Sequence, residues 1–246
     1  MQKADNSVRK TALVFGGSRG IGAAAVERLA KEGFNVAFTY ASSFTKAQAL
    51  VDRIASLEVE VAAIQADSGD PQAIRRAVAE TVARFGSIDA VVVNAGILRA
   101  AAVDAVSLED LDQMLSVNVR GVFLSIQATV PHLNDGARVV TIGSNVALHT
   151  RTPGFSVYQL TKTALVGMVK GVALDLAPRG ITVNNIQPGP TDTDMNAGLT
   201  EVLAGMSPLK RVGQPSEIAG LIAYLVGEDA GYVTGASLTI DGGFTL

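Results

Sequence analysis

The fold of this chain is decided by the stretch Val14-Phe15-Gly16-Gly17-Ser18-Arg19-Gly20-Ile21-Gly22. The apolar run before the turn, Ala12 to Phe15, is typical of a buried strand, and the alanine-rich run after it, Ala23 to Lys31, is typical of a helix. A strand, a glycine-rich turn and a helix in this order predict a phosphate-binding unit. An ordinary glycine-rich connection between a strand and a helix is the alternative.

Each glycine of the turn has an expected task. Gly16 makes the tight turn after the strand, Gly20 lets the backbone approach a pyrophosphate, and Gly22 lets the helix lie close to the sheet. The free amides and the dipole of the helix N-terminus then attract the anion. The turn therefore predicts a site for a nucleotide cofactor.

The rest of the chain repeats this alternation of apolar runs and helical patterns. Runs this apolar are typical of strands buried on both faces, so we expect a parallel sheet under two layers of helices. No linker, charge block or internal repeat divides the 246 residues, which predicts one α/β domain over residues 1–246. The expected strands are 12–15, 35–40, 59–65, 90–94, 137–144, 182–187 and 237–240, and the expected helices begin near residues 21, 45, 71, 108, 155 and 215.

Composition excludes several classes of protein. A net charge of −3 gives no reason to expect nucleic acid or a membrane surface as partner. The absence of cysteine excludes disulfides and thiolate catalysis, and neither His132 nor His149 has a companion at metal-ligand spacing, so no metal site is expected. Met1 to Lys10 lacks the apolar core of a signal peptide, and no apolar run approaches the roughly 20 residues of a membrane helix. We therefore expect a soluble, cytoplasmic protein.

Tyr158 and Lys162 are spaced for acid–base chemistry. Four residues apart on a helix, they lie one turn apart on the same face. A lysine ammonium beside a phenol stabilises the phenolate, so the pKa of the tyrosine should fall toward the working pH. Such a tyrosine can give a proton to a carbonyl or take one from an alcohol. A surface helix with an extended lysine is the alternative.

Further motifs follow one another in a recognisable order. After the glycine turn they are Asn94-Ala95-Gly96, Asn118, Ser144, Tyr158, Lys162, Pro188-Gly189-Pro190-Thr191, Val233-Thr234-Gly235 and Asp241-Gly242-Gly243. Over essentially the whole chain this order resembles the short-chain dehydrogenase/reductase family, in the branch of bacterial ketone reductases that includes 3-oxoacyl-carrier-protein reductases. The resemblance implies a Rossmann fold with a seven-stranded parallel sheet and helices on both faces.

The resemblance also implies a catalytic set of Asn118, Ser144, Tyr158 and Lys162. Ser144 would hydrogen-bond the substrate oxygen, and Tyr158 would transfer the proton. Lys162 would bind the nicotinamide ribose and lower the pKa of the tyrosine. Asn118 would hold a water in the proton relay, or else brace a helix bend. The segment between Ser144 and Tyr158, part of the substrate pocket in the family, is one residue longer here than in many relatives.

The end of the second strand bears on the choice of cofactor. Enzymes that prefer NAD usually place an acidic residue here for the ribose 2′-hydroxyl, whereas this chain has Tyr40 and no acidic neighbour. Arg19, Ser42 and Ser43 suit a 2′-phosphate, which predicts NADP(H). The alternative is that Arg19 is solvated and the serines cap the next helix.

Comparison with the family completes the expected cofactor site. Asp67 would accept a hydrogen bond from the adenine amino group, or would only order its own turn. Val93 and Phe15 replace an asparagine and a threonine that are common in the family, and Phe15 removes a hydroxyl that ties the turn to a neighbouring strand. The expected cofactor-binding residues are Gly16, Ser18, Arg19, Gly20, Ile21, Gly22, Tyr40, Ala41, Ser42, Ser43, Asp67, Asn94, Ala95, Gly96, Tyr158, Lys162, Pro188, Gly189, Thr191 and Thr193.

These expectations lead to an NADPH-dependent ketone or β-ketoester reductase, reversible as an alcohol dehydrogenase. A 3-oxoacyl-carrier-protein reductase is one alternative. Another is a regulator that binds cyclic-di-GMP, because residues 38–41 and 187–190 resemble such a family member.

Three expectations concern partners and mobile parts. Leu133-Asn134-Asp135-Gly136 and Leu174-Asp175 stand where similar carrier-protein reductases present basic residues beside the active-site mouth, which favours free small ketones as substrates. Relatives commonly form homotetramers through the helix 155–176, whose apolar stripe could instead be buried in its own core. Residues 193–208 are expected to form a mobile lid over the substrate.

Overall fold

A parallel sheet with the strand order β3-β2-β1-β4-β5-β6-β7 runs through the centre of the molecule. The structure is a computed structural model that describes residues 9–246. The sheet confirms the predicted fold class and every predicted strand, with differences only at strand ends. The strands are β1 (Thr11–Phe15), β2 (Asn35–Tyr40), β3 (Val61–Gln65), β4 (Ile88–Val93), β5 (Leu133–Ile142), β6 (Thr182–Pro188) and β7 (Ser237–Ile240).

β5 differs most from its predicted bounds. It begins early because Leu133 pairs with Ile88, after which the ladder shifts register before Ala90 meets Arg138. It ends early because Ser144 starts a short 3₁₀ turn, with its hydroxyl accepting a hydrogen bond from the next-but-one amide. Ser144 is thereby held just beyond the carboxyl end of the strand, where parallel sheets of this kind bind their ligands.

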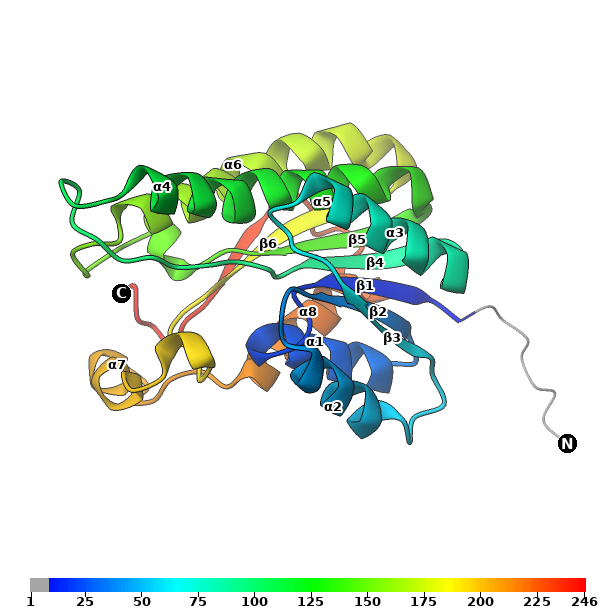
Figure 1. The fold of residues 1–246 in the computed structure, drawn as a ribbon, viewed down its shortest axis with the longest axis horizontal. Helices are drawn as coiled ribbons and strands as arrows, with labels where there is room; N and C mark the ends of the chain where they lie inside the picture. The colour runs from blue at the N-terminus through cyan, green and yellow to red at the C-terminus, as the bar shows by residue number, and fades with distance from the viewer. Residues whose placement is uncertain (1–8) are drawn as a thin grey trace, which may run out of the picture.

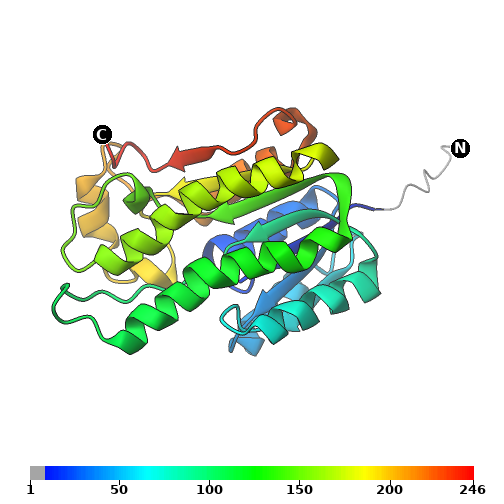
Figure 2. The ribbon, with the colours of Figure 1, turned by 90° about the horizontal axis from the view of Figure 1, so that it is seen from above.

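Helices cover both faces of the sheet (Figure 1). Seen from above, the helical segment α4–α5 and the long helix α6 run side by side over one face (Figure 2). That layer contains α3 (Pro71–Phe85), α4 (Leu108–Leu115), α5 (Val122–Thr129) and α6 (Ser156–Leu176), and the opposite layer contains α1 (Gly20–Lys31), α2 (Phe44–Ile54) and α8 (Pro215–Val226).

Alternation along β1 shows how the sheet builds two cores. Leu13 and Phe15 pack into the core under α3, α5 and α6, whereas Ala12 and Val14 pack into the core under α1, α2 and α8. All four side chains are completely buried. Successive strand residues point to opposite faces, and burial of each Leu, Val or Phe contributes about 1.5–3 kcal/mol. The strand therefore holds both layers at once.

Two of the predicted helix starts are set by side-chain caps. Asp70 accepts a 2.8 Å hydrogen bond from the amide of Gln72, and Pro71 occupies the first helical position of α3. Ser107 accepts a 3.0 Å hydrogen bond from the amide of Asp110 at the start of α4. Both helices therefore begin where they were expected, near residues 71 and 108, and the Asp70-Pro71 cap is the one that the sequence predicted.

The segment 193–208 lies at the carboxyl ends of the strands, at the same end of the molecule as the C-terminus (Figures 1 and 2). It contains a 3₁₀ turn, Asp194–Asn196, and the short helix α7 (Thr200–Met206). A Cβ atom on Gly20 would stand only 3.1 Å from Thr193 Cγ2, so the segment rests on the glycine turn. Within residues 9–246, no helix has both the length and the apolar character needed to cross a membrane.

Candidate active site

The glycine turn has the close backbone contacts that its sequence predicted. Gly16 has a φ of +76°, and a Cβ atom there would lie 2.8 Å from the backbone of Ala95. A Cβ atom on Gly22 would lie 2.0 Å from Gly16 O, so α1 can start this close to the turn only because residue 22 is glycine. Sequence analysis missed Gly17, whose Cβ would lie 2.5 Å from the Cβ of Phe38.

Thr39 supplies the hydroxyl that Phe15 does not. Its Oγ1 accepts a 2.9 Å hydrogen bond from Gly16 N, and Asn94 Nδ2 donates a 2.7 Å hydrogen bond to Gly16 O. The turn is therefore tied to β2 on one side and to the residue after β4 on the other. The departure from the family pattern at Phe15 is compensated by a threonine on the neighbouring strand.

A cleft of about 480 Å³ opens along this edge of the sheet. It brings together most of the expected cofactor residues, which come from six separate segments of the chain. The expected residues that line it are Gly16, Ser18, Arg19, Gly20, Ile21, Tyr40, Ala41, Ser42, Ser43, Asp67, Asn94, Ala95, Gly96, Tyr158, Lys162 and Thr193.

Four expected cofactor residues do not line the cleft. Gly22 packs beneath the turn, as described above. Gly189 lies against Asp241, because a Cβ atom on this glycine would stand 2.5 Å from the Cβ of that residue. Thr191 donates a 2.9 Å hydrogen bond to Gly189 O, and Pro188 is the last residue of β6. These residues shape the backbone that leads into the 193–208 segment.

Apolar side chains that were not expected from the sequence also line the cleft. Ile97, Leu98 and Met195 line it together with Tyr158. Isolated apolar residues in loops carry no periodic signal, so only the fold could identify them. They give the cleft an apolar wall beside the predicted proton donor.

Tyr158 and Ser144, two members of the catalytic set that the resemblance implies, lie close enough for the serine side chain to lower the pKa of the tyrosine. The expected fall in the pKa of the tyrosine is wrong for the protein alone. Burial raises the pKa of Tyr158 to about 12, and the polar side chain of Ser144 opposes only part of that rise. The phenol is therefore held in its neutral, proton-donating form.

Lys162 does not lower the pKa of Tyr158 because its ammonium is itself buried and directed elsewhere. Its Nζ lies 5.7 Å from the centroid of the Tyr158 ring and donates a 2.8 Å hydrogen bond to Ile142 O. Burial lowers the pKa of Lys162 to about 8. Lys162 lines the cleft and could contact a bound cofactor there.

Asn118 lies inside a π-helical segment, Ser116–Gly121, between α4 and α5. Its Oδ1 accepts from Ile97 N and its Nδ2 donates to Ile97 O, both at 2.8 Å. The same Nδ2 lies 3.2 Å from Thr161 Oγ1 on α6. The side chain therefore braces a helix irregularity, which was the alternative, and fixes the loop that carries Ile97. A role in a water relay stays a prediction.

Asp67 orders its own turn and also faces the cleft. Its Oδ1 accepts a 2.8 Å hydrogen bond from Gly69 N. The residue lines the cleft near Ser42. The hydrogen bond from Gly69 N shows that Asp67 orders its own turn, which was the alternative. Contact between Asp67 and adenine stays a prediction.

Arg19 lines the cleft and shares its acidic partner, Asp194, with a cation that was not expected from the sequence, Lys46. Arg19 Nη1 is 3.5 Å from Asp194 Oδ2, and Lys46 Nζ is 2.7 Å from the same oxygen. No local pattern connects Lys46 with Asp194, because 148 residues separate them. Hydrogen bonding and charge from Lys46, with a smaller effect of Arg19, lower the pKa of Asp194.

The residues of the cleft fit a dinucleotide. The glycine turn lines the cleft and leads directly into the N-terminus of α1. Arg19 and several hydroxyl side chains line the same cleft as Tyr158 and Lys162. This is the arrangement that a phosphate-bearing redox cofactor needs.

Known proteins are similar to this chain in both fold and sequence. A family model described as Enoyl-(Acyl carrier protein) reductase matches residues 16–245. A short-chain dehydrogenase/reductase from Serratia marcescens is 49% identical with a TM-score of 0.94, over 97% of this chain and 99% of its own. The chain belongs to the short-chain dehydrogenase/reductase family. It is therefore a member of a family of oxidoreductases.

Three other similar proteins are relevant to the cofactor and the activity. A short-chain dehydrogenase from Burkholderia cenocepacia, solved in complex with NADP, is 45% identical with a TM-score of 0.94, over 98% of this chain and 100% of its own. The cyclic-di-GMP-binding biofilm dispersal mediator protein of Escherichia coli is 40% identical over 96% of this chain and 97% of its own. A 3-oxoacyl-[acyl-carrier-protein] reductase of Staphylococcus aureus is 38% identical over 96% and 98%.

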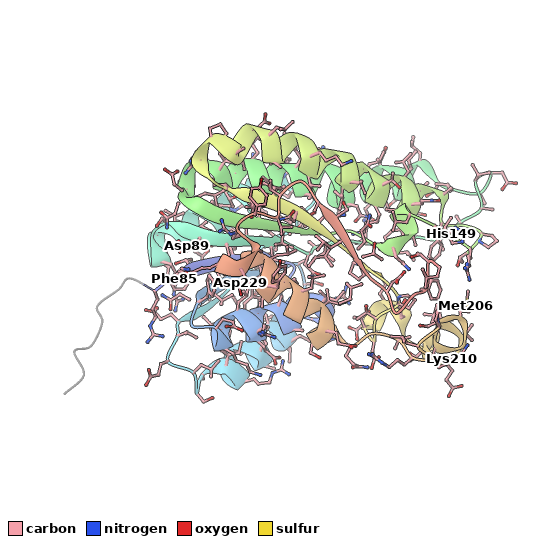
Figure 3. The ribbon with its side chains drawn as sticks, turned by 180° about the vertical axis from the view of Figure 1, so that it is seen from behind. Phe85, Asp89, His149, Met206, Lys210 and Asp229 are labelled. Carbon is pink, nitrogen blue, oxygen red and sulfur yellow. The ribbon has the colours of Figure 1, made fainter. Side chains whose placement is uncertain are left out.

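Residues 133–136 were expected to lie beside the active-site mouth, and within one chain this expectation is wrong. Leu133 begins β5 and Ser144 follows its end, so residues 133–136 lie at the opposite edge of the sheet from the active site. Figure 3 shows this separation, with Asp89, which accepts a hydrogen bond from Asn134, at the other end of the molecule from His149. Asp135 is paired with Arg179 at 2.9 Å. The charges of residues 133–136 therefore do not indicate whether the active-site mouth of the same chain would attract an acidic carrier protein.

The apolar stripe of α6 faces its own core. Leu165, Val169, Ala173 and Leu176 are buried, and the neighbouring apolar residues of the stripe pack against the same cluster. The apolar stripe of α6 is therefore explained by burial in the core of its own chain, which was the alternative. It gives no evidence for a subunit contact.

Proposed function

We propose that this protein is an NADPH-dependent carbonyl reductase that acts on small ketones or β-ketoesters and can run in reverse as an alcohol dehydrogenase. The observation that carries the proposal is that the buried Tyr158 lines the cleft together with Lys162, with the Ser144 side chain next to it. The Tyr158 phenol keeps its proton at neutral pH, so the proton that reduction of a carbonyl requires is present. Oxidation of NADPH measured against a panel of ketones tests it directly.

The cofactor that fits this proposal is NADP(H), which supplies the hydride when bound. The glycine turn and the N-terminus of α1 would hold its pyrophosphate, and Arg19 would face its 2′-phosphate. Lys162 would stand at the ribose next to the reacting ring. Support comes from the donor groups that line the cleft and from the NADP complex of the Burkholderia relative.

The protein's own groups divide the remaining chemistry. Ser144 orients the carbonyl oxygen and stabilises the negative charge that develops on it, and Tyr158 delivers a proton to that oxygen. The Asn118 side chain keeps the Ile97 loop in place beside them. The apolar wall limits access of water to the reacting atoms.

Free small ketones fit the surroundings of the cleft better than a carrier-bound substrate. Two arginines on segments that border the cleft are already engaged, since Arg99 lies 3.7 Å from Asp110 and Arg151 donates a 2.9 Å hydrogen bond to Leu246 O. An acidic carrier protein needs free positive charge for docking. Steady-state rates on ethyl acetoacetate and on an acetoacetyl-carrier protein compare the two substrates. A carrier rate that is far higher and falls steeply with salt would favour a 3-oxoacyl-carrier-protein reductase.

A second candidate function is binding of cyclic-di-GMP, which the similarity to the Escherichia coli mediator protein favours. A pure binding protein has no need for a buried proton donor. Calorimetric titration with cyclic-di-GMP, beside the ketone assay, separates the two functions. Tight binding of the dinucleotide without turnover of any ketone would support the regulator.

We also propose a homotetramer that uses the outward face of α6. Leu160 and Leu174 on that face are 55% and 77% exposed, and a Cβ atom on Gly167 or Gly171 between them would meet nothing within 4 Å. Such a face lets a second helix approach closely. Sedimentation of the wild type and of Leu174→Glu tests this, because a buried glutamate should shift the tetramer toward smaller species.

A further inference from the structure

The cations Arg19 and Lys46 converge on one oxygen of Asp194 at the cofactor cleft. The two distances to Asp194 Oδ2 are 3.5 Å and 2.7 Å, so a single carboxylate oxygen joins the glycine turn to the first turn of α2. All three side chains are more than half exposed, and such surface pairs are weak because solvent screens them. The contact is therefore easy to replace by a better anion.

This contact involves residues of the cleft in which the 2′-phosphate is expected to bind. Arg19, Ser42, Ser43 and Asp194 all line that cleft. Lys46 stands in the first turn of α2, which has no acidic residue, so the positive end of the helix adds to the charge of the lysine. A phosphate has three acceptor oxygens and a larger charge than a carboxylate, and it can pair with both cations at once.

We infer that Arg19 and Lys46 together form the pocket for the 2′-phosphate of NADP(H), and that Asp194 occupies this pocket until the phosphate displaces it. The inference rests on the proposed cofactor and assigns two residues that sequence analysis did not. Lys46 is a specificity-determining residue for the phosphate, and Asp194 is a competing anion carried by the 193–208 segment. Displacement of Asp194 releases the start of that segment from α2, so binding of the phosphate and the position of the segment are linked.

Calorimetric titration with two cofactor fragments tests the inference without any turnover. The fragment 2′,5′-ADP carries the 2′-phosphate and 5′-ADP lacks it, and neither contains the nicotinamide. Lys46→Gln should weaken 2′,5′-ADP by about tenfold, since a charge-assisted contact is lost, and leave 5′-ADP unchanged. Asp194→Asn should tighten 2′,5′-ADP by about threefold, because the competing pairs disappear.

Matched variants separate competition from general charge effects. Glu201→Gln removes one negative charge from the same segment, and Lys31→Gln removes one positive charge from the neighbouring helix α1; neither residue has an ion pair among residues 9–246. Neither variant should change the preference for 2′,5′-ADP. If Glu201→Gln and Asp194→Asn changed the affinity for 2′,5′-ADP equally, Asp194 would not compete with the 2′-phosphate.

The outcomes also distinguish this inference from the proposed cofactor. If wild-type protein prefers 2′,5′-ADP but Lys46→Gln binds it equally well, NADP(H) stands and the assignment of Lys46 is wrong. If Asp194→Asn fails to tighten the fragment, displacement of Asp194 is wrong. If the wild type shows no preference for the fragment with the 2′-phosphate, both the inference and the choice of NADP(H) fall together.

Discussion

The Lys162 ammonium donates a 2.8 Å hydrogen bond to the main-chain oxygen of Ile142, at the end of β5. The lysine is only 4% exposed, and this bond holds it between the sheet and the cleft. A buried charge with one neutral acceptor is unfavourable, which is why the pKa of Lys162 falls to about 8. The charged Lys162 side chain, which is expected to bind the cofactor, therefore lowers the stability of the folded protein when no cofactor is bound.

Replacement of Lys162 by methionine should change how stability depends on pH. Between pH 8 and 10.5 the unfolded chain keeps the lysine proton while the folded protein loses it, so the free energy of unfolding of the wild type rises with pH over this window. The total rise attributable to Lys162 is about 3 kcal/mol, and Lys162→Met should lack it. Urea unfolding of both proteins at several pH values measures the difference. Parallel pH profiles would show that Lys162 is not desolvated in the folded state.

Tyr158→Phe should abolish most carbonyl reduction while NADPH binding stays nearly intact. The variant keeps the ring and its packing but loses the transferable proton, which is worth about 10²–10⁴-fold in rate. Tyr224→Phe on the exposed face of α8 is the matched control and should keep full activity. Steady-state kinetics and fluorescence titration with NADPH provide the two measurements. Substantial residual turnover in Tyr158→Phe would remove this residue from the mechanism.

Arg19→Ala should weaken NADPH much more than NADH. The expected loss for NADPH is about 1.5 kcal/mol, because the guanidinium is largely exposed and a charge-assisted contact is then at the lower end of its range. Dissociation constants for both cofactors, measured at one salt concentration, give the ratio. Equal losses for both would show that Arg19 does not contact the 2′-phosphate.

Gly22→Ala should destabilise the protein and weaken cofactor binding together. The new Cβ atom would overlap Gly16 O at 2.0 Å and Asn94 Nδ2 at 2.6 Å, so α1 must move away from the turn. Overpacking of this kind costs about 1–3 kcal/mol or more. Gly205→Ala on α7, where nothing lies within 4 Å of the added atom, is the control. Thermal unfolding of both variants, with and without NADPH, checks the prediction, which fails if the two behave alike.

The sheet, the helix starts and the glycine turn could be predicted from the sequence because each depends on neighbours in the chain. Apolar runs predicted β1 to β7, and the Asp70-Pro71 pair predicted the start of α3. Glycines at 16, 20 and 22 mark a backbone that no other residue would allow, so the pattern carries the geometry of the turn. In a parallel sheet, the strand ends then determine the edge at which the site forms.

Tertiary structure alone decided the electrostatics of that site. The pKa of Tyr158 rises rather than falls because burial outweighs the spacing to Lys162, and burial is a property of the assembled core. Lys46 contacts Asp194 although 148 positions separate them in the sequence, and no local pattern predicts that contact. Charge interactions depend on distance through space and on the solvent that remains between the groups, and the order of residues along the chain contains neither quantity.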